Sequence, residues 1–210
     1  MAEVPAPSIG WLRRKQLTRT RVEDASLRLF AERGFEQTTV DDLAAAAGVG
    51  RRTIFRYFRS KNDIVFGALD ERLDVLAAEL ETARAAGLPL PDMVRRAFHV
   101  TSSYAPAERA SLAARIELIA TVPSLQAHAT LRYRAWEDTV RAAVAAAGTS
   151  AVHARACAKA VIAVMWAAFE AWLRTGAGED LQAMVDASLD VLMYGLAAAW
   201  DNSRWHGGEG

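Results

Sequence analysis

Basic side chains crowd a short predicted helix at residues 51–58. Arg52 and Arg56 are four residues apart, so they share the outer side of that helix. Ile54 and Phe58 have the same spacing and share the inner side. A guanidinium group can donate two hydrogen bonds to O6 and N7 of a guanine, or it can clamp a phosphate. The residue types and their spacing therefore predict a basic face that binds duplex DNA.

The segment before this helix is patterned to position it. Residues 39–47 form a predicted helix in which the Thr39 hydroxyl caps the first free N–H groups and Asp42 reaches back, as in a capping box. Gly48 ends that helix, and small alanines near the turn let the two helices pack closely. Residues 39–58 therefore form a candidate helix-turn-helix.

A plainer alternative exists for the basic residues. Many arginine-rich helices only present a solvated face, and this interpretation applies to Arg51, Arg52, Arg56, Arg59 and Lys61. The glycine turn and the capping pattern favour DNA binding over that alternative. Lys61 also stands at the start of the next predicted helix, where free N–H groups already favour anions.

Charge is divided along the chain. The 210 residues have no net charge, and 52% of them are apolar and 24% charged, as in an ordinary globular protein. Residues 1–62 nevertheless carry a net charge of +5, and residues 63–210 carry −5. This asymmetry suggests a basic N-terminal part that meets a polyanion, and an acidic remainder with another task.

Other classes of function lack their signals in this sequence. The single cysteine, Cys157, excludes an internal disulfide framework and a cysteine-based zinc cluster. No secretory signal is visible at the start, and the longest apolar run, 160–169, is about half a membrane span. Four scattered histidines and no catalytic motif argue against an enzyme. We expect a cytoplasmic protein without cofactor, metal or membrane association.

Alanine content, apolar periodicity and the placement of glycine and proline predict an all-α fold. About nine helices are expected, each bounded by capping residues or breakers. The predicted ranges are 17–33, 39–47, 51–58, 61–84, 92–104, 107–121, 124–147, 151–175 and 180–200.

Residues 27–65 contain several motifs at an ordered spacing. They are LFAERGF at Leu29–Phe35, TTVDDLAAAAGV at Thr38–Val49, RRTIFRYF at Arg51–Phe58 and SKNDI at Ser60–Ile64. This stretch resembles the DNA-binding domain of the TetR family of one-component bacterial transcriptional regulators. A second stretch, PSLQAHATLRYRAWEDTV at Pro123–Val140, is similar to regulators associated with mycofactocin gene clusters in actinobacteria.

The resemblance implies roles for individual residues, with helix 51–58 as the recognition helix and Thr39 and Lys61 at phosphate-contacting positions. The residues it places at DNA are Thr39, Arg51, Arg52, Thr53, Arg56, Tyr57 and Lys61. Two positions depart from the family pattern: Gly50 stands where many members have serine, and Phe55 where many have tyrosine. Each departure removes a hydroxyl that could contact a phosphate.

The resemblance also implies that the chain consists of domains with separate functions. We expect a flexible N-terminal arm at 1–15, a helix-turn-helix DNA-binding domain at 16–76, an effector-binding and dimerisation domain at 77–201, and a disordered tail at 202–210. In this family the last two helices pair with their mates in a homodimer.

The two last predicted helices, 151–175 and 180–200, carry more apolar surface than a one-sided helix needs. Two such helices per chain would form a four-helix interface across a two-fold axis. The predicted dimer interface contains Val161, Met165, Leu189, Leu192, Leu196 and Trp200. The alternative is that both helices simply fill the core of one chain.

An apolar effector pocket is predicted within the same domain. Its expected apolar lining is Tyr104, Ile116, Ile119, Trp136, Met165, Trp166 and Phe169. Arg115, His128 or Arg132 would fix a polar end. Aromatic and methionine residues at helical spacing also occur as plain core, which is the alternative. The similarity to mycofactocin-associated regulators favours a lipid-like or acyl thioester effector.

The sequence thus predicts a DNA-binding transcriptional regulator. Following the family default, we expect a homodimeric repressor that binds double-stranded DNA at a palindromic operator and is released by a small, largely apolar effector. The alternative is a helical effector-binding or dimerisation module that no longer binds DNA specifically. The retained arginines argue against that alternative.

Overall fold

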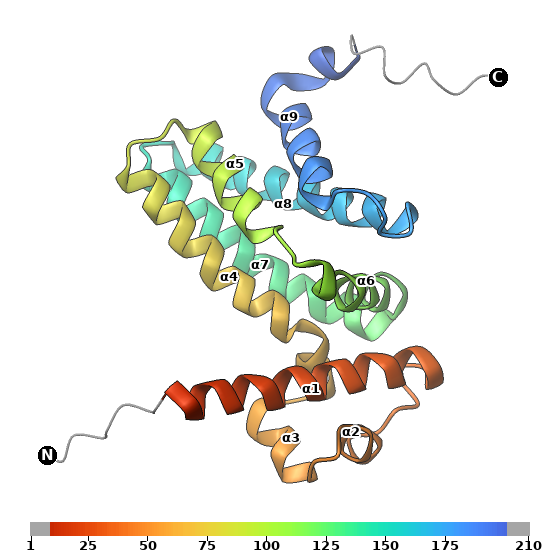
Figure 1. The fold of residues 1–210 in the computed structure, drawn as a ribbon. Coiled ribbons are helices and arrows are strands. Elements are labelled where there is room, and N and C mark those ends of the chain that lie inside the picture. Colours follow the sequence, from red (N-terminus) through yellow and green to blue (C-terminus); the bar gives the residue numbers. More distant parts are fainter. Residues whose placement is uncertain (1–8, 201–210) are drawn as a thin grey trace, which may run out of the picture. The chain divides into compact units, whose positions relative to one another are not determined.

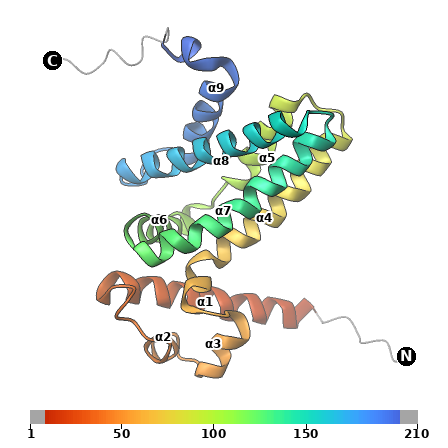
Figure 2. The same ribbon diagram turned by 180° about the vertical axis from the view of Figure 1, so that it is seen from behind.

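The computed structural model describes residues 9–200, and the side chains of residue 10 and residues 14–194. Within that part of the chain every regular element is a helix and no strand occurs (Figures 1 and 2). The helices are α1 (Ile9–Arg33), α2 (Val40–Ala47), α3 (Arg51–Tyr57), α4 (Lys61–Ala85), α5 (Leu90–Thr101), α6 (Pro106–Thr121), α7 (Pro123–Ala146), α8 (Ala151–Arg174) and α9 (Leu181–Trp200). The prediction of an all-α fold is confirmed.

The chain divides into two compact units, Met1–Ala68 and Leu69–Gly210. We call them the N-terminal unit and the C-terminal unit. The division falls inside α4, earlier than the predicted boundary after residue 76. No break in the chain marks it, because one continuous helix begins in the first unit and ends in the second.

In the N-terminal unit, α1 packs its one apolar face against α2 and the start of α4. All five residues expected from periodicity are buried: Val22, Ala25, Ser26, Leu29 and Phe30. Glu23 and Leu27 of the same helix are buried as well. Gly34 ends the helix with a φ of +84°, and its N–H donates to the Phe30 carbonyl at 2.9 Å. A side chain at that φ would be strained, so glycine suits the position.

The start of α4 approaches α1 closely at Gly67. A Cβ atom there would lie 2.5 Å from Nη2 of Arg19 and 3.1 Å from Oε1 of Glu23. Those two side chains are themselves paired, since Arg19 Nε donates to Glu23 Oε1 over 3.0 Å. Glycine at residue 67 therefore leaves room for an ion pair between α1 and α4.

The C-terminal unit is built around one apolar core. Helix α8 packs extensively against α7 and α9, while α5 covers α9 and α6 covers α7. Its largest fully buried side chains include Trp172, Phe98, Leu76, Leu80, Met93 and Ile116. Burying each such side chain stabilises the fold by about 1.5–3 kcal/mol relative to leaving it in water.

Helix α8 is long and apolar enough to cross a membrane by length and composition. Its buried residues Ile162, Phe169 and Trp172 belong to the core of the C-terminal unit. Core helices commonly pass the same test of length and composition.

Helix α1 is longer than predicted, because it begins at Ile9 rather than Leu17. Residues 9–15, which we assigned to a flexible arm, are therefore helical. The prediction from apolar periodicity did not include them, because residues 14–17 are exposed and have no apolar periodicity. Helix α5 also begins and ends earlier than predicted, at Leu90 and Thr101. The expected disorder at residues 1–8 and in the tail lies outside the described residues.

Candidate DNA-binding site and ligand-binding domain

Helix α2 is fixed at both ends by local hydrogen bonds. At its start, the Thr39 hydroxyl accepts from the Asp42 N–H at 3.2 Å, and the Asp42 carboxylate accepts from the Thr39 N–H at 2.9 Å. This is the predicted capping box. At its end, Gly48 has a φ of +62°, and the Val49 N–H donates to the Ala44 carbonyl at 3.0 Å. The turn between α2 and α3 is thus defined by the sequence around it.

Helix α3 has an inner and an outer side, as the spacing predicts. Ile54 is buried on the inner side, and Phe58, which directly follows α3, is buried with it. The residues exposed to solvent on the outer side are Arg51, Arg52, Phe55 and Arg56. Thr53 and Tyr57 are half-buried between the two sides.

The three arginines of α3 are held differently. Nη1 of Arg51 lies 3.1 Å from the Asp41 carboxylate on α2, so this guanidinium links the two helices. The Arg56 guanidinium stands 5.0 Å from the Tyr57 ring centroid, and its Nη2 donates to the Tyr57 hydroxyl at 3.3 Å. Among the described residues, nothing holds the guanidinium of Arg52. Its donors face water and are available to a ligand.

Lys61 has a different environment from the one we predicted. Its ammonium donates to the carbonyl of Phe35 at 2.5 Å and of Thr38 at 3.2 Å, in the connection between α1 and α2. It also stands 4.2 Å from the Phe35 ring centroid. Burial lowers the pKa of Lys61 below its ordinary value of 10.5, and the Glu36 carboxylate opposes that change. The expected phosphate contact would require the ammonium to leave these carbonyls, so the geometry favours a structural role.

Thr39 is similarly committed to the fold. Its hydroxyl donates to the Asp42 carboxylate at 2.5 Å while accepting from the Asp42 N–H. The hydrogen bonds from the Thr39 hydroxyl and N–H hold the pKa of Asp42 below its ordinary value of 3.8, and Arg33 adds a smaller effect. A phosphate contact through this hydroxyl would compete with the capping box.

Most of the predicted effector residues lie together in the core of the C-terminal unit. Ile116, Trp136, Met165 and Phe169 are buried in one cluster, and Tyr104 and Trp166 pack against it, while Ile119 is buried as well. Sequence reasoning missed Tyr133, whose ring centroid is 5.0 Å from that of Trp166. Tyr133 lies three residues before Trp136 on α7, and this spacing could have indicated that the two rings share one side of the helix.

Polar side chains from α4, α6 and α7 accompany this aromatic cluster. The Arg132 guanidinium is ion-paired with Asp70 of α4, and its Nη2 lies 3.5 Å from Nε2 of His128. Arg72 stands 4.1 Å from the Tyr104 ring centroid and 3.7 Å from the Glu108 carboxylate. Asp70 and Arg72 were not among the predicted site residues.

One predicted lining residue, Tyr104, and one predicted polar residue, Arg115, are shielded from water. Burial raises the pKa of Tyr104 to about 12, and the Arg72 guanidinium opposes the rise. Arg115 is only 3% exposed. A charge at that depth requires partners, so Arg115 is a constituent of the fold as well as a candidate ligand contact.

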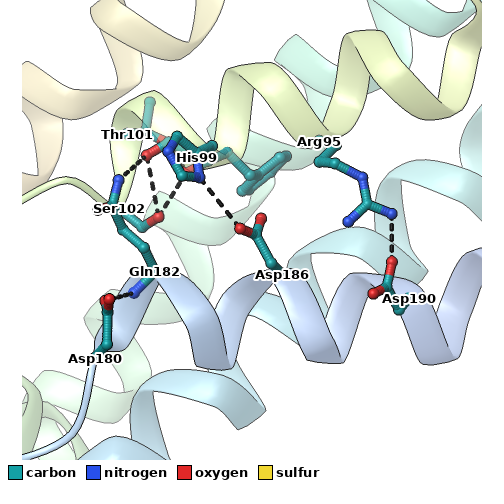
Figure 3. Close-up of polar contacts among 9 residues, drawn as sticks. Arg95, His99, Thr101, Ser102, Asp180, Gln182, Asp186 and Asp190 are labelled. Atoms are coloured by element: carbon teal, nitrogen blue, oxygen red, sulfur yellow. Dashed lines mark hydrogen bonds and ion pairs between the residues drawn. The ribbon is translucent and has the colours of Figure 1, made fainter.

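Figure 3 shows a polar seam that joins α5 to α9. Arg95 is ion-paired with Asp190, and Nδ1 of His99 lies 3.2 Å from the Asp186 carboxylate. The Gln182 amide donates to the His99 carbonyl at 3.0 Å. Residues 182, 186 and 190 are four apart, so this side of α9 is occupied by α5.

Three of the six predicted dimer residues need correction. Val161, Met165 and Leu189 are buried inside their own chain, because α8 and α9 pack against each other and against α5 and α7. A second copy could not cover side chains that are already covered. Leu192 is half-buried at the edge of the same core. The side chains of Leu196 and Trp200 lie outside those that the structure describes.

Comparison with known proteins identifies the family. Residues 24–68 match the family described as bacterial regulatory proteins, tetR family, and residues 88–197 match the MftR C-terminal domain. The chain is 32% identical over 187 residues to a Mycobacterium tuberculosis (strain ATCC 25618 / H37Rv) protein, covering 88% of this chain and 93% of that one. That relative carries the provisional name mycofactocin biosynthesis transcriptional regulator MftR. The chain belongs to the TetR family of bacterial transcriptional regulators.

Solved structures of TetR-family proteins share the fold. Thermus thermophilus FadR, described as a TetR-family transcriptional repressor in complex with lauroyl-CoA, has a TM-score of 0.60 and 22% identity over 85% of this chain and 94% of that one. A protein from Syntrophomonas wolfei has a TM-score of 0.65 and 17% identity over 86% and 97%. At these identities the likeness establishes the fold alone.

Family membership confirms the resemblance drawn from the sequence. It makes the chain a transcriptional regulator with a helix-turn-helix DNA-binding domain and a helical ligand-binding domain. Regulators of this family bind DNA and small effectors, and they are not enzymes.

Proposed function

We propose that this TetR-family protein is a cytoplasmic homodimeric repressor that binds a palindromic operator and is released by a small, largely apolar effector. The observation that carries the proposal is the exposed basic side of α3, with Arg51, Arg52 and Arg56 outward and Ile54 buried beneath them. A short helix of this kind fits the major groove of duplex DNA.

The DNA-contacting residues would be ranked by how they are held. Arg52 and Arg56 are best suited to base edges, because no described residue bonds the Arg52 guanidinium and the Arg56 guanidinium lies against Tyr57. Arg51 would face phosphate while keeping its bond to Asp41. Thr53 and Tyr57 flank the same side and would add contacts to sugar or phosphate.

A homodimer would use the outward sides of α8 and α9 instead of the residues first predicted. The exposed described residues of α9 are Ala183, Ala187, Val191 and Tyr194, and α8 exposes Ala163 and Ala167 between the charged residues Lys159 and Arg174. We call these four alanines, Val191 and Tyr194 the outer α8–α9 residues. Small side chains allow helices of two copies to approach closely, and a two-fold axis would match a palindromic site. Tyr194 is 67% exposed in the single chain, which is unusual for so large a ring.

The effector would enter the aromatic cluster of the C-terminal unit. Trp166 lies between the rings of Tyr133 and Phe169, at centroid distances of 5.0 and 6.3 Å. These rings suit an apolar tail. Arg132, which pairs with Asp70, and Arg72, which lies over the Tyr104 ring, suit an anionic head. An acyl thioester has both parts. The lauroyl-CoA bound to Thermus thermophilus FadR supports this class by analogy of fold only.

Coupling between the two sites would run through α4. This helix begins at Lys61 inside the N-terminal unit, where the Lys61 ammonium bonds the connection between α1 and α2, and it ends at Ala85 in the C-terminal unit. Asp70 and Arg72 of the same helix contact α7 and α6 side chains. An effector that alters those contacts would move α4, and the spacing of the two recognition helices in the dimer would change.

Selection of bound duplexes from a random pool tests the proposal directly. We expect a palindrome with half-sites about one helical turn or more apart, and affinity that falls steeply with salt. A matched pool incubated with the Arg52→Ala, Arg56→Ala double variant should enrich no sequence. Recovery of no specific duplex by the unaltered protein would instead support the alternative of a module that has lost specific DNA binding.

A further inference from the structure

Phe55 is exposed in a way that the fold does not explain. The chain has seven phenylalanines, all within the described residues, and the other six are 5% exposed or less. Phe55 is 48% exposed. Leaving half of an aromatic ring in water forgoes the stabilisation that the other six provide, so the position calls for a different account.

The neighbours of Phe55 on the helix are cations. Arg51 and Arg52 precede it by four and three residues, and Arg56 follows it, so all three share the outer side. An apolar ring among guanidinium groups is complementary to a surface with anionic edges and an apolar floor. The major groove of DNA has phosphates at its edges, and the thymine C5 methyl group is the apolar feature on its floor.

A cation lies beside the ring before any ligand arrives. The Arg51 guanidinium carbon stands 5.6 Å from the Phe55 ring centroid. Arg51 in turn is anchored to α2, where its Nη1 contacts both carboxylate oxygens of Asp41 at 3.1 and 3.3 Å. A phenylalanine side chain has only two rotatable bonds, so ordering it on binding costs little conformational entropy.

We propose that Phe55 is a specificity-determining residue that contacts the C5 methyl group of one thymine in each operator half-site. The proposal rests on the proposed function, in which α3 enters the major groove. Thymine is favoured because the ring gains an apolar contact there. At guanine, adenine or cytosine the same ring would cover hydrogen-bonding groups without replacing their bonds to water.

The test replaces thymine by deoxyuridine, which removes only the methyl group. Each symmetry-related pair of thymines in the selected operator is replaced in turn, and the dissociation constant is measured by fluorescence anisotropy. Loss of one methyl contact should weaken binding about fourfold, and loss of both about fifteenfold, at one position of the half-site. Other thymine pairs should show smaller effects that do not depend on Phe55.

Protein variants then assign that effect to the ring. Phe55→Ala should bind thymine and deoxyuridine operators equally at the sensitive position, and Phe55→Leu should retain part of the preference. Leu131→Ala is the matched control, because Leu131 is an exposed apolar side chain on α7 and outside the proposed sites. It should keep the full thymine preference. Thermal unfolding of each variant checks that α3 remains folded.

The outcomes separate this inference from the proposed function. If the unaltered protein binds its operator specifically but tolerates deoxyuridine at every position, Phe55 does not read thymine. The same conclusion follows if Phe55→Ala keeps the thymine preference. If no operator is enriched at all, the proposed function itself fails, and the inference fails with it.

Discussion

Lys61 Nζ lies 2.5 Å from the carbonyl oxygen of Phe35, which ties the first residue of α4 to the connection between α1 and α2. The ammonium also bonds the Thr38 carbonyl, one residue before the cap of α2. One lysine therefore joins three helices of the N-terminal unit. The helix-turn-helix depends on that joint, because α2 and α3 are both short.

We predict that Lys61→Met lowers the stability of the protein by about 1–2 kcal/mol. Methionine keeps the stem over Phe35 but leaves three backbone carbonyls without their charged donor. Urea unfolding followed by circular dichroism measures this change. Lys159→Met is the control, because Lys159 makes an exposed pair with Glu137 at 3.1 Å and should cost little. If Lys61→Met reduces the slope of log affinity against log salt concentration by about one, Lys61 contacts a phosphate after all, as first predicted.

The stabilisation that Asp42 provides in the α2 capping box should depend on pH. The folded-state pKa of Asp42 is depressed, so its contribution to stability is complete above the ordinary value of 3.8 and is lost as pH falls through the lower folded value. The stability difference between the unaltered protein and Asp42→Asn should therefore shrink on going from pH 6 towards pH 3. Urea titrations of both proteins at several pH values measure it. A difference that grew in acid would contradict the assigned sign.

Arg52 and Arg56 should both matter for sequence preference. Replacing either by alanine should cost about 1–3 kcal/mol of operator binding if the side chain reads a base edge, and it should relax preference at one position of each half-site. Arg141→Ala is the control, because Arg141 lies on α7 and pairs with Asp138. Competition assays against operator and random DNA make the distinction. Equal losses on both would make the arginines phosphate contacts.

The proposed dimer predicts that Ala187→Glu or Val191→Glu yields monomers. Both residues are exposed in the single chain, so the substitutions should leave the protomer folded. In the dimer they would bury unpaired charge, at a cost of several kcal/mol. Sedimentation equilibrium measures the state of assembly, with Leu131→Glu on α7 as the control. A stable, operator-binding dimer with Glu at residue 187 or 191 would place the interface elsewhere.

The sequence was sufficient for the presence and approximate position of the helices, apart from the start of α1 and the ends of α5, and for the two sides of α3. Ile54, Phe58 and the arginines follow from spacing alone, because a helix converts sequence separation directly into direction. Lys61 could not be predicted in the same way. Its partners are backbone carbonyls more than twenty residues earlier, and carbonyls carry no signature in the sequence.

The dimer residues show a second limit. The sequence correctly indicated that α8 and α9 carry many apolar residues. Their number does not show which neighbouring helix covers them. Val161 and Leu189 face their own chain, whereas Ala183 and Ala187, which carry little apolar signal, face outward. Helical periodicity identifies a buried side of each helix; only the packing of all the helices shows whether that side is buried within one chain or between two.

The effector proposal predicts a reciprocal coupling between the two sites. Acyl-CoA thioesters of increasing chain length should bind the protein, and operator DNA should weaken each of them by the same factor by which they weaken operator binding. A factor of about 5–150 is expected, because a coupling of about 1–3 kcal/mol is typical of such regulators. Isothermal titration with and without a saturating operator duplex measures it.

Chain length and head group separate the two parts of the candidate ligand site. If the rings of Tyr133, Trp166 and Phe169 receive the tail, affinity should rise with each added methylene until the cluster is filled, by about fourfold per group. If Arg132 and Arg72 receive the head, the free fatty acid of the same length should bind more weakly than its thioester, since coenzyme A carries phosphates. Tight binding that operator DNA leaves unchanged would contradict the coupling through α4. Absence of any chain-length dependence would instead make the aromatic cluster a plain core, because a packed core has no room that a longer tail could fill.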